Sequence, residues 1–196
     1  MTTGLRWRIF VLQIGLIGIL AFVAGFAFWA SGFATSQVQS QLAAQKITFP
    51  AANSTAITSL PKADAAAMRV YAGQELTTGA QAETYADHFI KVHLNEIGKG
   101  QTYSQVSAAS MADPTNAALA GEVQTLFRGS TLRGLLLNSY GWWQIGQYAL
   151  YAAIGLTVAA LVVFGAFVFE LVSWRVAVRK EQPARVPVPS LGTETA

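Results

Sequence analysis

Two long apolar runs dominate this sequence, one from Ile9 to Phe33 and the other from Ile145 to Phe169. Each exceeds the roughly 20 residues that a helix needs to cross a hydrocarbon core about 30 Å thick. Tryptophans stand at both ends of both runs, where aromatic rings favour the membrane interface; they are Trp7, Trp29, Trp142, Trp143 and Trp174. The pattern predicts two transmembrane helices, over residues 9–33 and 145–171.

Basic residues outside these runs predict the orientation. They cluster in residues 1–8 and 172–196, as Arg6, Arg8, Arg175, Arg179, Lys180 and Arg185. Residues 34–144 carry equal numbers of basic and acidic side chains, so the net charge of +3 arises at the two ends. The positive-inside rule therefore places both termini in the cytoplasm and residues 34–144 outside it, in the cell membrane. Anionic lipids are expected partners, and nucleic acid is not.

A cleaved signal sequence is the alternative for the first run, because arginines precede it and small residues end it. The apolar region of a signal sequence is usually 7 to 15 residues long, so the length of this run favours a retained helix. The chain contains no cysteine, which excludes disulfides and thiolate metal sites. The segment between the runs must fold by packing alone, and its length suits one small domain.

Helix signals recur through this segment. The first helix is expected to continue for about three turns beyond Phe33, and residues 49–60 are expected to form a loop. A helix follows Pro61 through Val70, and two capping boxes then begin helices, Thr78 with Gln81 and Thr102 with Gln105. The first of these two helices ends at Gly98 and carries the best amphipathic pattern, with apolar residues from Ala82 to Ile97 on one side.

Further signals lead into the second apolar run. Asp113 and Pro114 resemble an N-cap and a first-turn proline. Gly129 is expected to break or bend the helix that follows them. No alternating strand pattern is present, so the predicted fold class is all-α: two transmembrane helices with a small helical extracytoplasmic domain between them. The basic, proline-rich segment 172–196 is expected to be a disordered cytoplasmic tail.

The two histidines, His88 and His93, are the first candidates for chemistry. They are five positions apart and so differ by roughly 140° around a helix, which prevents a shared metal face. His88 is expected to pair with Asp87 or Glu83. We expect no metal, no cofactor and no catalytic residue, because phosphate loops, dinucleotide motifs and nucleophile elbows are also absent from the sequence.

The most suggestive residues flank the expected bend at Gly129. Arg128 and Arg133 lie above Tyr140, Trp142 and Trp143. One interpretation is a structural elbow in which the arginines pair with Glu122 or with lipid headgroups. The other is a clamp for a lipid or a partner protein, since arginine binds phosphate and carboxylate groups in a bidentate manner.

Small residues within the runs predict close helix packing. Ala21 and Gly25, and also Gly155 and Ala159, are small residues four positions apart. Such pairs let helices approach closely in lipid. They would pack the two spans against each other or dock onto another membrane protein.

Four segments resemble a known family: ITFP at Ile47, YADHFIKVHL at Tyr85, GQTYSQVS at Gly100 and TLFRGSTLRGLLLNSYGWW at Thr125. With them the chain resembles an uncharacterised family of actinobacterial membrane proteins with two spans and one external loop, and the similarity covers nearly the whole chain from the first span to the second. Some relatives are labelled ring-opening dioxygenases, which implies a non-haem iron held by two histidines and a carboxylate. The two histidines of this chain do not supply that geometry on one helix, so the label is not transferred.

The leading hypothesis is a non-enzymatic double-pass membrane protein, an accessory or interaction module that associates with lipids and with a membrane-protein partner or with itself. The alternative is an extracytoplasmic module that binds a lipid or a small molecule. A metal-dependent enzyme is the third hypothesis.

Overall fold

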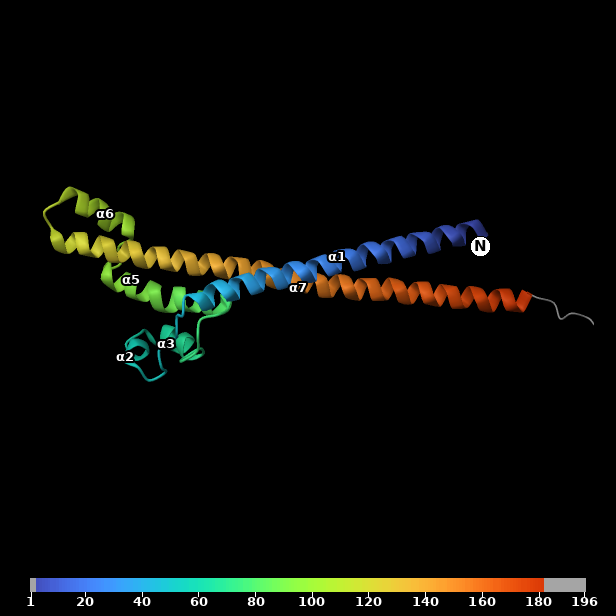
Figure 1. The fold of residues 1–196 in the computed structure, drawn as a ribbon, viewed down its shortest axis with the longest axis horizontal. Helices are drawn as coiled ribbons and strands as arrows, with labels where there is room; N and C mark the ends of the chain where they lie inside the picture. The colour runs from blue at the N-terminus through green and yellow to red at the C-terminus, as the bar shows by residue number, and fades with distance from the viewer. Residues whose placement is uncertain (1–2, 182–196) are drawn as a thin grey trace, which may run out of the picture. The chain divides into compact units, whose positions relative to one another are not determined.

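The computed structural model describes residues 3–181. The tail predicted at 172–196 was wrong in its first part, because residues 172–181 are helical and continue the last helix. The rest of the predicted tail lies outside the described residues. All regular elements in these residues are helices, as predicted, and a single isolated antiparallel bridge joins Thr48 and Glu75. Figure 1 shows two long helices with short helices between them in sequence. The elements are α1 (Thr3–Ala44), α2 (Thr55–Thr58), α3 (Lys62–Arg69), α4 (Gly79–Tyr85), the π-helix η1 (Ala86–Ile90), α5 (Lys91–Ile97), α6 (Tyr103–Ala112) and α7 (Ala117–Glu181).

The chain divides into two compact units, and both long helices run through both. We call Gly25–Ala153 the cap unit, and Met1–Ala24 with Ile154–Ala196 the terminal unit. In the terminal unit, Phe10 of α1 is buried against two aromatic rings of α7. Its ring centroid lies 5.6 Å from that of Phe167, edge to face, and 6.1 Å from that of Trp174.

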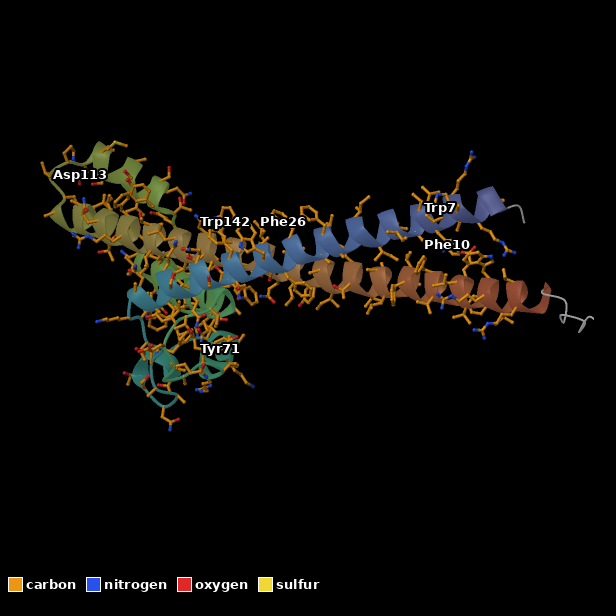
Figure 2. All side chains as sticks on the ribbon, turned by 45° about the vertical axis from the view of Figure 1, so that its right-hand side comes forward. Trp7, Phe10, Phe26, Tyr71, Asp113 and Trp142 are labelled. Carbon is orange, nitrogen blue, oxygen red and sulfur yellow. The ribbon has the colours of Figure 1, made fainter. Side chains whose placement is uncertain are left out.

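Apolar side chains in α1 and α7 are largely exposed. The helical segments Gly4–Ala44 and Ala117–Arg179 are long and apolar enough to cross a membrane, and only 6% of the most apolar stretch of each is buried. Figure 2 shows side chains projecting from both helices, among them those of Trp7 and Phe26 on α1 and of Trp142 on α7. The most apolar stretch of each helix is therefore mostly uncovered in the structure.

The core of the cap unit is built around the loop that follows α1. Phe49, Ile57, Met68 and Leu76 are almost completely buried in it, together with Leu42 of α1. Backbone hydrogen bonds hold the loop at residues 47–49 to residues 73–76: Phe49 N–H to Gln74 O at 2.9 Å and Leu76 N–H to Ile47 O at 2.8 Å. Burial of these apolar side chains is the main stabilising contribution.

Local end signals predicted several helices correctly. α1 continues to Ala44, about three turns beyond Phe33. Both capping boxes are formed, at Thr78 before α4 and at Thr102 before α6. Pro61 directly precedes α3, and α5 ends before Gly98.

Two predictions about local structure were wrong. Residues 49–60 are not all loop, because α2 forms at Thr55–Thr58 and buries Ile57 completely. α7 begins at Ala117 rather than after Asp113: Leu119 N–H donates to the Asn116 side chain at 3.1 Å, whereas Asp113 accepts a hydrogen bond from the Thr115 hydroxyl. Asn116 therefore takes the capping role that was predicted for Asp113.

Gly129 does not break the helix, and α7 runs without interruption from Ala117 to Glu181. A Cβ atom at position 129 would overlap the end of the Leu94 side chain. The glycine thus permits α5 to approach α7 closely, which is a packing role rather than a turn. The elbow predicted from the sequence is absent.

Candidate functional site

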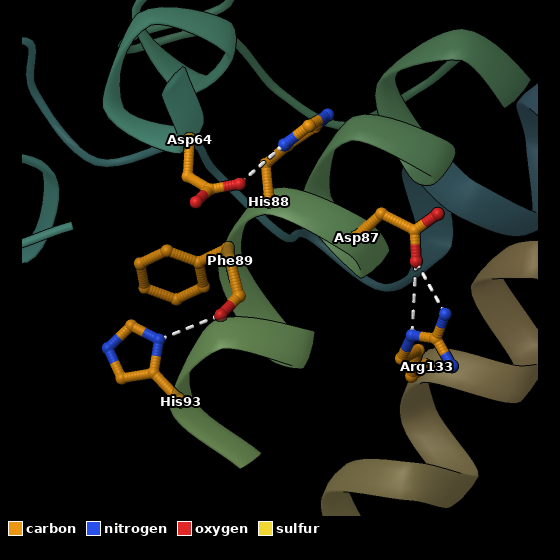
Figure 3. Close-up of polar contacts among 6 residues, drawn as sticks. All are labelled: Asp64, Asp87, His88, Phe89, His93 and Arg133. Carbon is orange, nitrogen blue, oxygen red and sulfur yellow. Dashed lines mark hydrogen bonds and ion pairs between the residues drawn. The ribbon is translucent and has the colours of Figure 1, made fainter. Parts of the chain in front are cut away.

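The π-helix η1 is the irregular element of the cap unit. A π segment adds one residue to a helical turn and so rotates the side chains that follow it. In Figure 3, the neighbouring residues Asp87 and His88 project toward different elements. His88 Nδ1 lies 2.7 Å from Asp64 Oδ1 of α3, while Asp87 accepts from Arg133 of α7. The segment is thereby connected to two other helices by side-chain contacts.

The Asp87–Arg133 contact has two hydrogen bonds. Arg133 donates from Nε at 3.2 Å and from Nη2 at 2.5 Å, both to Oδ1 of Asp87. Of the two pairings predicted for the arginines, the one with Glu122 was wrong: Glu122 lies 3.6 Å from Lys99 Nζ, and Arg133 pairs with Asp87. Arg133 is consequently held by a carboxylate within the chain. Pairing with lipid headgroups stays a prediction.

The two histidines do not converge. His88 pairs with Asp64, so the predicted pairing with Asp87 or Glu83 was wrong. His93 Nδ1 donates to Phe89 O at 2.8 Å, and its ring packs on that of Phe89 with centroids 4.5 Å apart. Over residues 3–181, no three His, Cys, Asp or Glu side chains gather into a group that could hold a metal ion.

Tyr85 is partly buried and packs against the core of the cap unit. Its ring packs edge to face on Phe49, with centroids 5.2 Å apart, and against Phe89 at 4.9 Å. Burial raises the pKa of the Tyr85 phenol above its ordinary value of 10.0, because the charged phenolate is disfavoured away from water.

The five residues predicted to form a lipid or partner contact lie in different surroundings. Arg133 pairs with Asp87, whereas Arg128 is exposed. Trp143 packs against the core cluster and stacks with Tyr140, with ring centroids 6.3 Å apart. Trp142 is exposed and lines a groove. Their contact with a lipid or a partner stays a prediction.

That groove lies between α1 and α7 within the cap unit and has a volume of about 550 Å³. No charged side chain lines it among the described residues. Its walls are apolar with amide and hydroxyl groups between them, formed by Phe33, Ala34, Gln37, Val38, Gln41, Leu42, Gln45, Ile47, Leu132, Leu135, Leu136, Asn138, Ser139 and Trp142. The groove can hold an uncharged, mostly hydrocarbon group.

The sequence prediction missed the α1 wall of the groove. Gln37, Gln41 and Gln45 recur every four residues, a spacing that places them along one face of a helix. This glutamine repeat was the sequence signal that could have indicated the α1 wall of the groove. It does not reveal that α7 lies opposite, about a hundred positions later in the chain.

A second hollow of about 370 Å³ lies beside the groove, and Leu132 lines both. It is formed by Phe89, Ile90, His93, Leu94, Thr125, Arg128, Gly129 and Leu132. Arg128 is the one Lys or Arg among the residues that line either hollow. The two hollows together therefore combine an apolar groove with a cationic end.

The small residues predicted for helix packing remain largely uncovered. Ala21, Gly25 and Gly155 are exposed, and Ala159 is half-buried. A Cβ atom at Gly25 or Gly155 would meet no other heavy atom within 4 Å. In the cap unit the close approach occurs instead at Gly146, where a Cβ would lie 3.0 Å from Thr35 Cγ2. Docking of the uncovered residues onto another helix stays a prediction.

Comparisons with protein-family models, with curated proteins and with solved structures give no match to this chain. The resemblance to a two-span actinobacterial family accordingly stays a prediction.

Proposed function

We propose that the chain is a double-pass membrane protein whose cap unit is an extracytoplasmic interaction module. The exposure of apolar side chains along α1 and α7 carries this proposal: Leu12 is 72% exposed, Phe22 77% and Phe169 75%. Apolar surface in water costs about 25 cal/mol per Å², so helices of this length need a lipid environment or another protein. A bilayer covers both helices along their whole apolar length.

The proposed orientation places both termini in the cytoplasm, as the arginines outside the spans favour. The cysteine-free sequence permits a direct test, since a single introduced thiol is the sole labelling site. Asn53→Cys, in the cap unit, should react with a membrane-impermeant maleimide in intact cells. Val178→Cys should react only after the cells are permeabilised. The reverse pattern, or equal labelling of both, would contradict the orientation.

The accessory role is supported by the open small-residue faces. Helices in lipid associate where glycine and alanine let backbones approach, and Gly25 and Gly155 have such open surroundings. Gly155→Leu should reduce the partner or second copy that co-purifies in mild detergent. Gly165→Leu is the matched control, because Gly165 is also open but lies on a different face of α7. A wild-type chain that always purifies alone would contradict the role.

The groove favours a second candidate function, a module that binds a lipid or a small apolar molecule. Its volume of about 550 Å³ lies within the range of ligand pockets, roughly 300–1,000 Å³. Phe33 and Trp142, two of its lining residues, stand at the ends of the predicted spans. A hydrocarbon chain could therefore enter from the bilayer. Retention of lipid through purification would support this function, and a lipid-free, fully folded chain would oppose it.

A further inference from the structure

Arg128 differs from the paired cations of the cap unit. In the described part of the chain, Arg133 contacts Asp87 and Lys99 contacts Glu122, whereas no acidic side chain lies within 4.0 Å of the Arg128 side chain. Arg128 also borders a hollow whose other walls are mostly apolar. A guanidinium there is free to bind an external anion, and its planar fork suits phosphate oxygens.

His93 lines the same hollow. Its Nδ1 is committed, because the Phe89 carbonyl can only accept a hydrogen bond and Nδ1 must donate it. The ring nitrogen left for a ligand is Nε2. A phosphate monoester can bind both groups. One anionic oxygen accepts hydrogen bonds from Arg128. At His93, a neutral Nε2 accepts a hydrogen bond from a P–OH group, and a protonated Nε2 donates one to a second anionic oxygen.

Leu132 connects this hollow to the groove, since its side chain lines both. From Leu132 to Trp142 the helix rises by about 15 Å, at 1.5 Å per residue. The groove along this length has no charged lining residue, and the amides of Gln37, Gln41 and Gln45 border it. Hydrocarbon fits the apolar wall, and the amides can bond to the ester or hydroxyl groups that link a lipid chain to its head group.

We propose that the cap unit binds one phosphate-bearing amphiphile, with its phosphate at Arg128 and His93 and its hydrocarbon chain in the groove beyond Leu132. The proposal rests on the lipid-binding function above and names the ligand class and the residue that selects it. Charge complementarity supports it, because the cation stands at one end of an otherwise uncharged site.

The test uses the full chain in dodecyl maltoside, with bound ligand counted by native mass spectrometry. Three probes separate the parts of the ligand: palmitoyl lysophosphatidic acid carries both parts, hexadecanol has a chain without phosphate, and inorganic phosphate has no chain. Wild-type protein should bind the lysophosphatidic acid at least tenfold more tightly than hexadecanol and should not retain inorganic phosphate. Arg128→Gln should remove this tenfold preference and leave hexadecanol binding unchanged.

Two further variants complete the experiment. Lys91→Gln removes an exposed cation that lines neither hollow, and it should leave all three affinities unchanged. Leu135→Glu places a charge in the groove at an exposed position and should weaken both chain-bearing probes. The proposal would be overturned if wild type and Arg128→Gln bound lysophosphatidic acid equally tightly, or if Lys91→Gln lost the tenfold preference to the same extent as Arg128→Gln. Displacement of lysophosphatidic acid by inorganic phosphate alone would also overturn it. If no probe binds while cysteine labelling still reports two spans, this inference fails and the membrane proposal stands.

Discussion

Arg133 and Asp87, 46 positions apart, are joined by two hydrogen bonds from one guanidinium to one carboxylate oxygen. The arginine lies on α7 and the aspartate on η1, so the pair ties the long helix to the irregular segment of the cap unit. Both side chains are partly accessible, at 33% and 29%. The pair is neither a solvated surface contact nor a fully buried one.

Arg133→Gln is expected to destabilise the cap unit by about 1–2 kcal/mol. This range lies between the contribution of an exposed ion pair to the free energy of unfolding and that of a hydrogen bond to a charged group. Denaturant unfolding in detergent would measure the change. Arg128→Gln is the matched control and should shift stability by less than about 0.5 kcal/mol, as for an ordinary surface substitution. Equal losses in the two variants would show that the Asp87 contact contributes nothing specific.

Gly79→Ala is expected to destabilise the fold by about 1–3 kcal/mol, as for an overpacked core. A Cβ atom there would overlap the Cβ and Cγ atoms of Trp143, and atoms so close to the backbone of α7 cannot swing aside. The control is Gly121→Ala, because that helical position has no other heavy atom within 4 Å. It should stabilise by up to about 1 kcal/mol through helix propensity. Melting temperatures that move in the same direction for both variants would contradict the steric role assigned to Gly79 against Trp143.

Helix ends that depend on neighbouring residues could be predicted from the sequence. Thr78 with Gln81 and Thr102 with Gln105 make their capping bonds within four positions, so the pattern and the structure report the same local interaction. The extension of α1 to Ala44 was also predictable, because Val38 and Leu42 repeat at helical spacing and are buried.

Features that depend on distant residues could not be predicted. Glycine disfavours the interior of a helix, yet Gly129 faces Leu94 and lies within an unbroken helix. The π segment turns Asp87 toward α7 and His88 toward α3. Local spacing had instead predicted that His88 pairs with acidic neighbours on its own helix. The groove likewise needs both α1 and α7. Of its residues, only Trp142 was selected from the sequence.

Gln13→Leu is expected to stabilise the terminal unit by about 1 kcal/mol. The Oε1 atom of Gln13 is buried and has no hydrogen-bond partner among the described residues. Leaving a buried acceptor unsatisfied costs about 1–3 kcal/mol, which an apolar side chain of similar length avoids. Thermal unfolding in detergent would show a higher melting temperature. A lower one would indicate that Gln13 bonds to another molecule, and Ile14→Leu, at an exposed apolar position, controls for a general effect of leucine.

The partly buried phenol of Tyr85 predicts how stability depends on alkaline pH. Its pKa is raised above 10.0 in the fold, so the folded chain keeps the phenolic proton where the unfolded chain has lost it. Below about pH 10 both states hold the proton, and the contribution is fully present. As pH rises through 10 and then through the higher folded pKa, the unfolded state is favoured and the contribution is lost.

Tyr85→Phe isolates this effect, since phenylalanine keeps the ring contacts with Phe49 and Phe89 and removes the titrating group. The free energy of unfolding should fall more steeply above pH 10 in the wild type than in the variant, and the two profiles should run parallel below it. Tyr148→Phe, at an exposed position on α7, should follow the wild type. Parallel profiles for wild type and Tyr85→Phe above pH 10 would mean that the Tyr85 hydroxyl reaches water in the folded protein.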